Sequence, residues 1–310
     1  MNLTSAYSIF QQPWWLEAVA PGSWGEVIIE KGGQIYARLP YVIKRKYGLK
    51  VMDMPPLTLH LGPWLRAFPG KYANRISEEH QLMAELIENL PSFDVFQQNF
   101  HFSITNWLPF YWKGFQQTTH YTYRINNLSD ISLIWESFRE NIRGDIRKAE
   151  SRFNLRIRTD LPVDAFIPLN IQTFERQGRN LPYPESLIRR LDAACVEHNA
   201  RKIFIAEDKL GRHHAGVYIV WDEQSAYYLM GGGHPTLRSS GATSLCMWEA
   251  IQFAATVTKS FDFEGSIIEP IERFFRSFGA QQTPYFQVVK INSLPLRVYY
   301  DLRSWLRYLK

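Results

Sequence analysis

The stretch from Lys202 to Gly233 reads KIFIAEDKLGRHHAGVYIVWDEQSAYYLMGGG and decides the fold class, because it predicts three consecutive strands. The expected strands are Lys202–Glu207, His214–Trp221 and Ser225–Gly231. Each is rich in apolar, β-branched and aromatic residues. The short polar segments KLG at 209–211 and DEQ at 222–224 separate the strands. Connections this short join neighbouring strands as hairpins, so the stretch predicts an antiparallel meander.

Helices and strands alternate on both sides of this meander. After it we expect a helix over Thr243–Ala255, a strand over Ser260–Glu264, a helix over Glu269–Phe278 and a strand over Tyr285–Asn292. Before it we expect a strand over Leu155–Arg158 and helices over Val163–Gln177 and Pro184–His198. This order predicts a mixed α/β (α+β) class, in which mostly antiparallel sheets are flanked by helices.

The clearest helical pattern runs from Asp130 to Phe153, where apolar residues recur every three or four positions. The stripe consists of Ile131, Trp135, Phe138, Ile142, Ile146, Ala149 and Phe153. Arg139, Arg143 and Arg147 lie on other faces and form a basic surface. A chain of 310 residues exceeds the usual size of one hydrophobic core. We therefore expect two domains, 1–128 and 129–310, with this helix at the boundary.

The first 128 residues carry a weaker but similar pattern. The expected elements are a helix over Pro13–Val19, strands over Glu26–Glu30 and Gln34–Val42, a helix over Ser77–Leu90, and strands over Asp94–Asn99 and Thr119–Ile125. A Gly32-Gly33 pair between the first two strands favours a tight turn. The segment from Phe102 to Tyr123 is aromatic and rich in loops.

The composition is that of a globular protein of a reducing compartment. The net charge of +5 favours anionic partners such as phosphates, nucleotides or tRNA. The two cysteines, Cys195 and Cys246, lack the spacing of a zinc or redox motif, and no histidine cluster suggests a metal. The N-terminus has no signal-peptide pattern, and no apolar stretch is long enough to span a membrane. We expect a cytoplasmic protein with no integral membrane segment and no metal cofactor.

A polar loop before the helix expected at Thr243 offers a place for a phosphate. Arg238, Ser239, Ser240 and Gly241 precede that helix, whose first backbone N–H groups carry the positive end of the helix dipole. One guanidinium group lies beside them. Because serine and glycine also commonly cap helices, the pattern fits either a donor-phosphate site or simple capping.

From Gly178 to Lys290 the chain resembles the Fem (FemABX) family of peptidoglycan aminoacyltransferases and related GNAT-like proteins of envelope-polysaccharide pathways. The resemblance rests on Ala226–Leu229 (AYYL), Trp248–Ile251 (WEAI), Phe261–Gly265 (FDFEG) and Phe274–Gly279 (FFRSFG). Weaker matches are Phe10-Gln11, Trp14-Trp15 and Gly62-Pro63. It implies two tandem GNAT-like domains and a transferase of cell-wall biogenesis. It further implies transfer of an acyl or aminoacyl group, from acyl-CoA or aminoacyl-tRNA, to an amine of an envelope precursor.

The resemblance also implies residues that bind substrate. Arg176 falls where relatives hold acceptor phosphate with an arginine, although an ion pair with Glu175 or Glu185 would equally explain it. Tyr228, in the AYYL match, and Arg276 complete the implied substrate-binding set. Where relatives carry a lysine, this chain has Phe275. A neutral ring cannot stabilise a phosphate, so either Arg276 replaces the lysine or the acceptor differs.

Two carboxylates are the expected catalytic groups. Asp262 and Glu264 alternate along the strand Ser260–Glu264 and are therefore expected on one face near its end. Either could accept a proton from the attacking ammonium group. Glu264 is the better candidate because it lies closer to the following loop, whereas Asp262 could equally have a buried structural role.

A second reading of the sequence is a non-catalytic protein of the same fold. Such a protein would bind RNA or an anionic glycan through the basic surface at Arg139, Arg143 and Arg147. The presence of Phe275 where relatives carry a lysine favours this reading, because a protein that has lost its enzymatic activity also loses charged site residues. The fold alone does not decide between the two readings.

Overall fold

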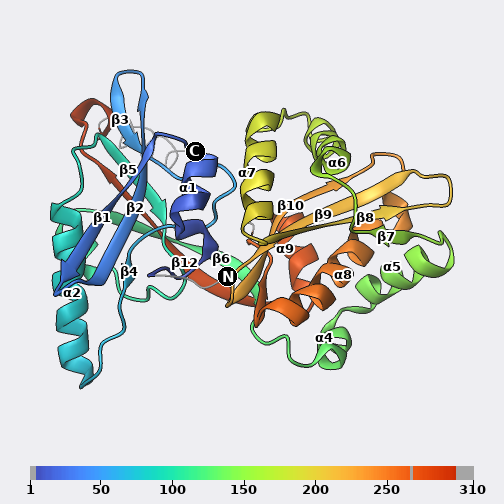
Figure 1. The fold of residues 1–310 in the computed structure, drawn as a ribbon, viewed down its shortest axis with the longest axis horizontal. Coiled ribbons are helices and arrows are strands. Elements are labelled where there is room, and N and C mark those ends of the chain that lie inside the picture. Colours follow the sequence, from blue (N-terminus) through green and yellow to red (C-terminus); the bar gives the residue numbers. More distant parts are fainter. Residues whose placement is uncertain (1–4, 266–267, 298–310) are drawn as a thin grey trace, which may run out of the picture. The chain divides into compact units, whose positions relative to one another are not determined.

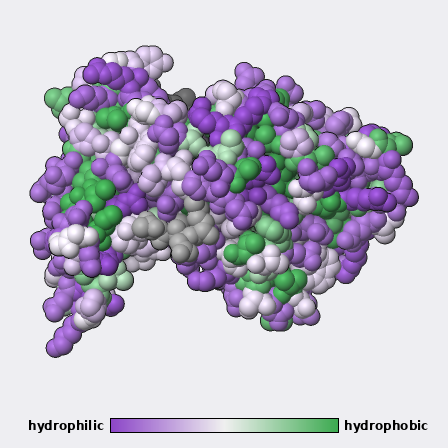
Figure 2. All heavy atoms as spheres, viewed as in Figure 1, coloured by the Kyte–Doolittle hydropathy of each residue, from purple (hydrophilic) through white to green (hydrophobic). Residues whose placement is uncertain are grey.

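The computed structural model describes residues 5–265 and 268–297. They divide into two compact units, which we call the N-terminal unit (5–120 and 284–297) and the C-terminal unit (121–265 and 268–283). This division differs from the expected boundary at residue 128, because residues from Pro284 onward belong with the N-terminal unit. The cause is strand β12 (Gln281–Ile291), which pairs antiparallel with β5 (Val95–Asn99). The face seen in Figure 2 is mostly hydrophilic, with apolar residues in separate groups.

The sheet of the C-terminal unit confirms the predicted meander (Figure 1). Its strand order is β6-β11-β10-β9-β8-β7. The strands are β6 (Gln116–Ile125), β7 (Arg156–Arg158), β8 (Arg201–Glu207), β9 (His213–Trp221), β10 (Ser225–Gly233) and β11 (Ser260–Asp262). All neighbouring pairs are antiparallel except β10 and β11, which run parallel. The predicted mixed α/β class with a mostly antiparallel sheet is therefore confirmed.

Helices cover both faces of this sheet. The helices are α4 (Ile131–Ser137), α5 (Glu140–Ser151), α6 (Val163–Glu175), α7 (Glu185–Glu197), α8 (Ala242–Val257) and α9 (Glu269–Arg276). Helices α5 and α8 pack in one core with Val217 and Ile219 of β9. Helix α6 covers the opposite face, where Phe166 contacts Tyr218 and lies against Gly216. Because side chains alternate along a strand, β9 supplies residues to both cores.

The single helix expected over Asp130–Phe153 is wrong, since the structure breaks it into α4 and α5. Phe138 and Arg139 have extended backbones, with ψ of 140° and 151°. The break lets the Phe138 ring pack against Trp248 and Phe278. It also lets the Arg139 N–H donate to the Ser277 carbonyl at 2.9 Å. Tertiary packing thus overrides a continuous helical period.

The strands of the N-terminal unit follow the order β1-β2-β3-β5-β12, with β4 paired to β2. The remaining strands are β1 (Trp24–Lys31), β2 (Gln34–Lys46), β3 (Leu49–Met52) and β4 (Trp64–Leu65). The helices are η1 (Ile9–Gln11), α1 (Pro13–Val19), α2 (Tyr72–Glu88) and α3 (Leu108–Trp112). Helix α2 begins five residues before the expected Ser77. A core that includes Leu82, Phe96 and Phe110 lies between α2 and the sheet.

Candidate functional site

The central feature of the C-terminal unit is the place where β10 and β11 part. The two parallel strands pair only from Ser225 to Tyr227 on β10, opposite Ser260 to Asp262 on β11. Strand β10 continues to Gly233, and its register against β9 shifts between Tyr228 and Met230, which makes Leu229 a β-bulge. Past Tyr227 the sheet therefore opens between its two parallel strands. Crevices beyond the carboxyl ends of parallel strands are where α/β folds bind ligands.

Helix α6 packs closely along the part of β10 that lies beyond Tyr227. Asn170 Nδ2 donates to the Gly231 carbonyl at 2.8 Å, and the Gly233 N–H donates to Thr173 Oγ1 at 3.0 Å. A Cβ atom at Gly232 would overlap the α6 backbone at Leu169. The strand expected to end at Gly231 thus continues through Gly232 and Gly233, and the missing side chain at Gly232 lets the helix backbone approach β10.

The loop after β10 presents an uncapped helix N-terminus. It forms a short 3₁₀ helix, η2 (Arg238–Ser240), and then Gly241, whose φ of +81° suits glycine. Helix α8 starts at the next residue and receives no hydrogen bond from a capping side chain. Ser240 Oγ is buried and has no hydrogen-bond partner within the described chain. The loop leaves the first N–H groups of α8 for another acceptor, which favours an anion site over simple capping.

Two guanidinium groups meet beside this loop. Arg176 ends α6, and its pKa is lowered by burial and then by the positive charge of Arg238. The expected ion pair of Arg176 with Glu175 or Glu185 is not among the ion pairs of the described residues, and Glu185 instead binds Arg189 at 2.9 Å. The sequence analysis expected Arg176 to bind the phosphate of the acceptor and Arg238 to bind the phosphate of the donor. The structure brings both charges to one place, where a single anion would relieve their repulsion.

Asp262 is buried and hydrogen-bonded, which fits the structural role that the sequence offered as the alternative to a catalytic one. Its Oδ1 accepts hydrogen bonds from the Thr122 hydroxyl and, at 2.9 Å, from the Glu264 N–H. Arg124 Nε lies 3.5 Å from the other oxygen, Oδ2. Burial raises the pKa of Asp262 to about 6, although Thr122, Arg124 and the backbone N–H each act in the opposite direction. Asp262 therefore holds the turn that carries Glu264.

Glu264 lies beyond the strand and not on it, so the expected shared strand face with Asp262 is wrong. Strand β11 ends at Asp262, and Glu264 has a left-handed backbone with φ of +55°. Its Oε1 atom is buried without a hydrogen-bond partner in the described part of the chain. Burial, followed by the charge of Asp262, raises the pKa of Glu264 well above its usual value. A strained backbone and a raised carboxylate pKa are both typical of a catalytic base.

Two tyrosines share the surroundings of Glu264. The pKa of Tyr183 is raised by burial and by the charge of Glu264. The pKa of Tyr228 is raised by burial and then by Cys246, Glu264 and Tyr183. The hydroxyl of Tyr228 lies over Gly231, where a Cβ atom would overlap it. Glu264, Tyr183 and Tyr228 thus form one cluster where β10 and β11 part.

Comparison with known proteins agrees with this geometry. Residues 136–267, which contain the meander, the loop at Arg238 and Glu264, match the family model described as acetyltransferase (GNAT) domain. We refer to this matched segment, residues 136–267, as the GNAT domain. A comparison with curated proteins finds no match to the sequence.

Solved structures that share the fold extend the likeness over both units. FemX has a TM-score of 0.68 at 13% identity, with 96% of this chain and 98% of that chain covered. L-PGS from Bacillus licheniformis has a TM-score of 0.55 at 11% identity, covering 93% and 90%. A tandem GNAT protein from the clavulanic acid biosynthesis pathway has a TM-score of 0.53 at 10% identity, covering 90% and 86%. The predicted likeness to Fem and GNAT proteins is therefore confirmed at the level of the fold.

Phe275 belongs to the core of the C-terminal unit. Its buried ring packs against Tyr228 and Phe263, with ring centroids 5.8 and 5.4 Å apart. Arg276 donates from Nε to Glu272 at 2.8 Å, and Glu272 also accepts from the Tyr123 hydroxyl at 2.8 Å. The Phe275 ring therefore packs edge-on against the Tyr228 ring. The guanidinium of Arg276, which the sequence offered as a replacement for the lysine, is paired with Glu272.

The C-terminal unit also contains candidate site residues that the sequence patterns did not indicate. Tyr183 lies in the polar segment between α6 and α7, which carries no regular pattern. Thr122 lies on β6, 140 residues from the Asp262 carboxylate that it binds. The one sequence signal for Tyr183 is that an aromatic residue stands in an otherwise polar loop.

The histidines of β9 do not form a metal site in the described chain. His213 Nε2 and His214 Nε2 lie 3.2 Å from Glu207 and Asp208, respectively. Among the described residues, no three histidine, cysteine or acidic side chains gather as metal ligands. None of the described helices is long and apolar enough to cross a membrane.

The raised pKa of Asp262 predicts a pH-dependent stability. In the unfolded chain this carboxyl has a pKa near 3.8, and folding raises it to about 6. The folded state therefore binds the proton more tightly, and the resulting stabilisation is complete below pH 4 and lost as the pH rises through 6. We expect the difference in unfolding free energy between the wild type and Asp262→Asn to change by about 2 kcal/mol between pH 4 and pH 7. Urea denaturation at both pH values measures it, and an unchanged difference would contradict the assignment.

Proposed function

We propose that the GNAT domain transfers an acyl or aminoacyl group from acyl-CoA or aminoacyl-tRNA to an amine of a peptidoglycan or envelope-polysaccharide precursor. The observation that carries this proposal is the pair of guanidinium groups, Arg176 and Arg238, beside the uncapped N-terminus of α8. Two cations without an ion-pair partner in the described chain, together with free N–H groups, favour the phosphate of a donor. Glu264 lies where the opening between β10 and β11 begins.

The chemistry follows from these positions. The acceptor amine arrives as an ammonium ion, and Glu264 takes one proton from it. The neutral nitrogen then attacks the carbonyl carbon of the donor, and the C–N bond forms as the bond to the thiolate or ribose oxygen breaks. That leaving group takes up a proton. Holding donor and amine together supplies much of the rate, and N–H groups polarise the carbonyl. We assign the orientation of the amine to the hydroxyls of Tyr183 and Tyr228, because the charge of Glu264 acts on both.

The basic surface of α5 offers less support for RNA binding than the sequence suggested. Arg143 and Arg147 both bind Glu140, at 2.8 and 3.1 Å. Lys148 binds Asp145 at 2.7 Å. These pairs neutralise part of the charge on which the non-catalytic alternative depends. The guanidinium groups beside α8 have no such partners in the described chain, and they are the better phosphate site.

Binding experiments test the anion site. We expect calorimetry to detect CoA or aminoacyl-tRNA binding, and Arg176→Ala and Arg238→Ala each to weaken it by about tenfold to a hundredfold, as for lost hydrogen bonds to charged groups. Arg156→Ala removes the same charge from the exposed edge strand β7, three strands away from β10, and is the matched control. Equal affinity in all three variants would contradict the proposal.

A further inference from the structure

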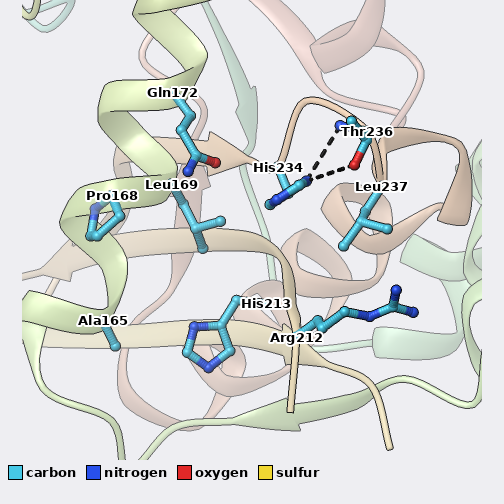
Figure 3. Close-up of a pocket in the computed structure, with 9 residues that line it drawn as sticks. All are labelled: Ala165, Pro168, Leu169, Gln172, Arg212, His213, His234, Thr236 and Leu237. Carbon is cyan, nitrogen blue, oxygen red and sulfur yellow. Dashed lines mark hydrogen bonds between the residues drawn. The ribbon is translucent and has the colours of Figure 1, made fainter. Parts of the chain in front are cut away.

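The C-terminal unit has a cavity of about 420 Å³ between α6, the start of β9 and the loop that follows β10 (Figure 3). Gln172 and Leu237 line it, four residues before Arg176 and one residue before Arg238, so we count it with the proposed donor site. The N-terminal unit has a groove of its own, to which the proposed function gives no role. We propose that this groove is a second binding site and that its ligand is a short saccharide.

The groove runs along α2. It consists of two hollows, of about 510 and 260 Å³. Arg75 and Glu79 of α2 line both hollows, as do Thr105 and Asn106 of the loop between β5 and α3, so the two are continuous. Every lining residue belongs to the N-terminal unit. Together the hollows offer the volume of an ordinary small-ligand site, roughly 300 to 1,000 Å³.

Aromatic rings line both parts of the groove. Tyr72 and Trp107 line the larger hollow, and Tyr7 and Phe68 line the smaller one. The side chain of Tyr72 is 71% exposed, so its own unit leaves much of the ring free for a ligand. The faces of a sugar ring are rich in C–H groups and stack on aromatic rings as other apolar surfaces do. The aromatic lining therefore suits a ligand made of sugar rings.

Arg75 and Glu79 bring opposite charges to the groove. They are four residues apart on α2, a spacing at which such side chains commonly form an ion pair. Within the described chain neither side chain has an ion pair or a hydrogen bond, and the Arg75 guanidinium lies 6.0 Å from the centre of the Tyr72 ring. The pKa of Tyr7 is raised by burial, lowered by its hydrogen bond to the Leu65 backbone and raised by the charge of Glu79. The carboxylate and the guanidinium therefore both remain available to a ligand.

A saccharide satisfies this lining better than a phosphate-bearing ligand does. Each sugar hydroxyl both donates and accepts, so neighbouring hydroxyls can donate to the Glu79 carboxylate and accept from the Arg75 guanidinium. Asn106 Oδ1 accepts from the Leu108 N–H at 3.2 Å, which leaves the NH₂ group of Asn106 as a further donor. A phosphate could bind Arg75, but the carboxylate of Glu79 would repel it.

An NMR titration of the full chain with uncharged trisaccharides tests the inference. The probes are cellotriose, maltotriose and the trimer of N-acetylglucosamine. We expect at least one of them to bind once per chain with a Kd of about 1 mM or tighter. Tyr72→Ala should weaken that binding about threefold to tenfold through the lost stacking. Glu79→Gln should weaken it about tenfold through the lost hydrogen bond to a charged group.

Matched variants outside the groove provide the controls. Tyr47 is a fully exposed aromatic residue in the turn between β2 and β3. Glu78, next to Glu79, instead pairs with Lys31 at 3.5 Å. Tyr47→Ala and Glu78→Gln should retain the wild-type affinity. Because Tyr72 is largely exposed and glutamine keeps the shape of glutamate, both groove variants should fold, which circular dichroism checks.

The possible failures are distinguishable. Absence of binding by all three trisaccharides would overturn the inference, as would binding that neither groove variant weakens. Binding of pyrophosphate that Arg75→Ala weakens, with no binding of a trisaccharide, would identify an anion site and overturn the inference as well. These titrations contain no acyl donor, so each failure leaves the proposed acyl transfer intact, and the Arg176 and Arg238 variants test that transfer separately.

Discussion

Glu264→Gln should lower the rate of acyl transfer by about 10² to 10⁴-fold, the usual contribution of a general base. Glutamine keeps the size of the side chain but accepts no proton from the ammonium group. Because the pKa of Glu264 is raised well above its usual value, the wild-type rate should fall as the pH drops through that raised pKa. The variant should lose this limb of the pH profile. Steady-state rates from pH 5 to pH 9, with the donor that binds and a primary amine, measure both effects.

A matched carboxylate serves as the control for Glu264. Glu249 lies on α8 and also has a pKa raised by burial, with a further contribution from Glu150. Glu249→Gln should leave the rate and its pH profile unchanged. A Glu264→Gln protein that retains both the wild-type rate and the acidic limb would remove Glu264 from the catalytic site.

Gly241→Ala should destabilise the C-terminal unit by about 3 kcal/mol or more and abolish donor binding. Its φ of +81° costs a side chain about 1 to 2 kcal/mol. A Cβ atom there would also overlap the Asp145 carbonyl oxygen, so α5 or the loop would have to move. Urea denaturation followed by circular dichroism measures the change.

The neighbouring Gly144 provides a control of opposite sign. It lies within α5, and a Cβ atom there would meet open space. Since glycine in a helix is less favourable than alanine, Gly144→Ala should stabilise the unit by about 0.5 to 1 kcal/mol. Equal effects of the two substitutions would contradict the tight contact between Gly241 and α5.

Local patterns predicted the C-terminal unit well because its elements are short and clearly separated. The apolar and β-branched segments within Lys202–Gly231, with the polar turns between them, predicted both the strands and their antiparallel pairing. The same reasoning failed where distant contacts decide the backbone. Phe138 fits a helical stripe, yet its packing against Trp248 and Phe278 ends the helix. The pairing of β12 with β5 is equally distant along the chain, so no local pattern places Pro284 with the N-terminal unit.

The candidate site was predictable in its residue types but not in its arrangement. Arg176, Arg238, Tyr228 and Glu264 could be proposed from motif and position. Arg176 and Arg238 come close enough to repel each other beside α8. This proximity depends on how α6 packs along Gly231–Gly233, which no local pattern predicts. The alternation of Asp262 and Glu264 assumed a strand that in fact ends at Asp262. The left-handed backbone at Glu264 takes its side chain off the strand that ends at Asp262.

A crystal structure of the protein with CoA, or with aminoacyl-tRNA if that is the donor, tests the central claim most directly. The account predicts phosphate oxygens within hydrogen-bond distance of Arg176, Arg238 and the first N–H groups of α8. The acyl-bearing end should lie where β10 and β11 part, beside Glu264. Phosphates bound along Arg139, Arg143 and Arg147, with the opening beside Glu264 empty, would contradict it and favour the non-catalytic alternative.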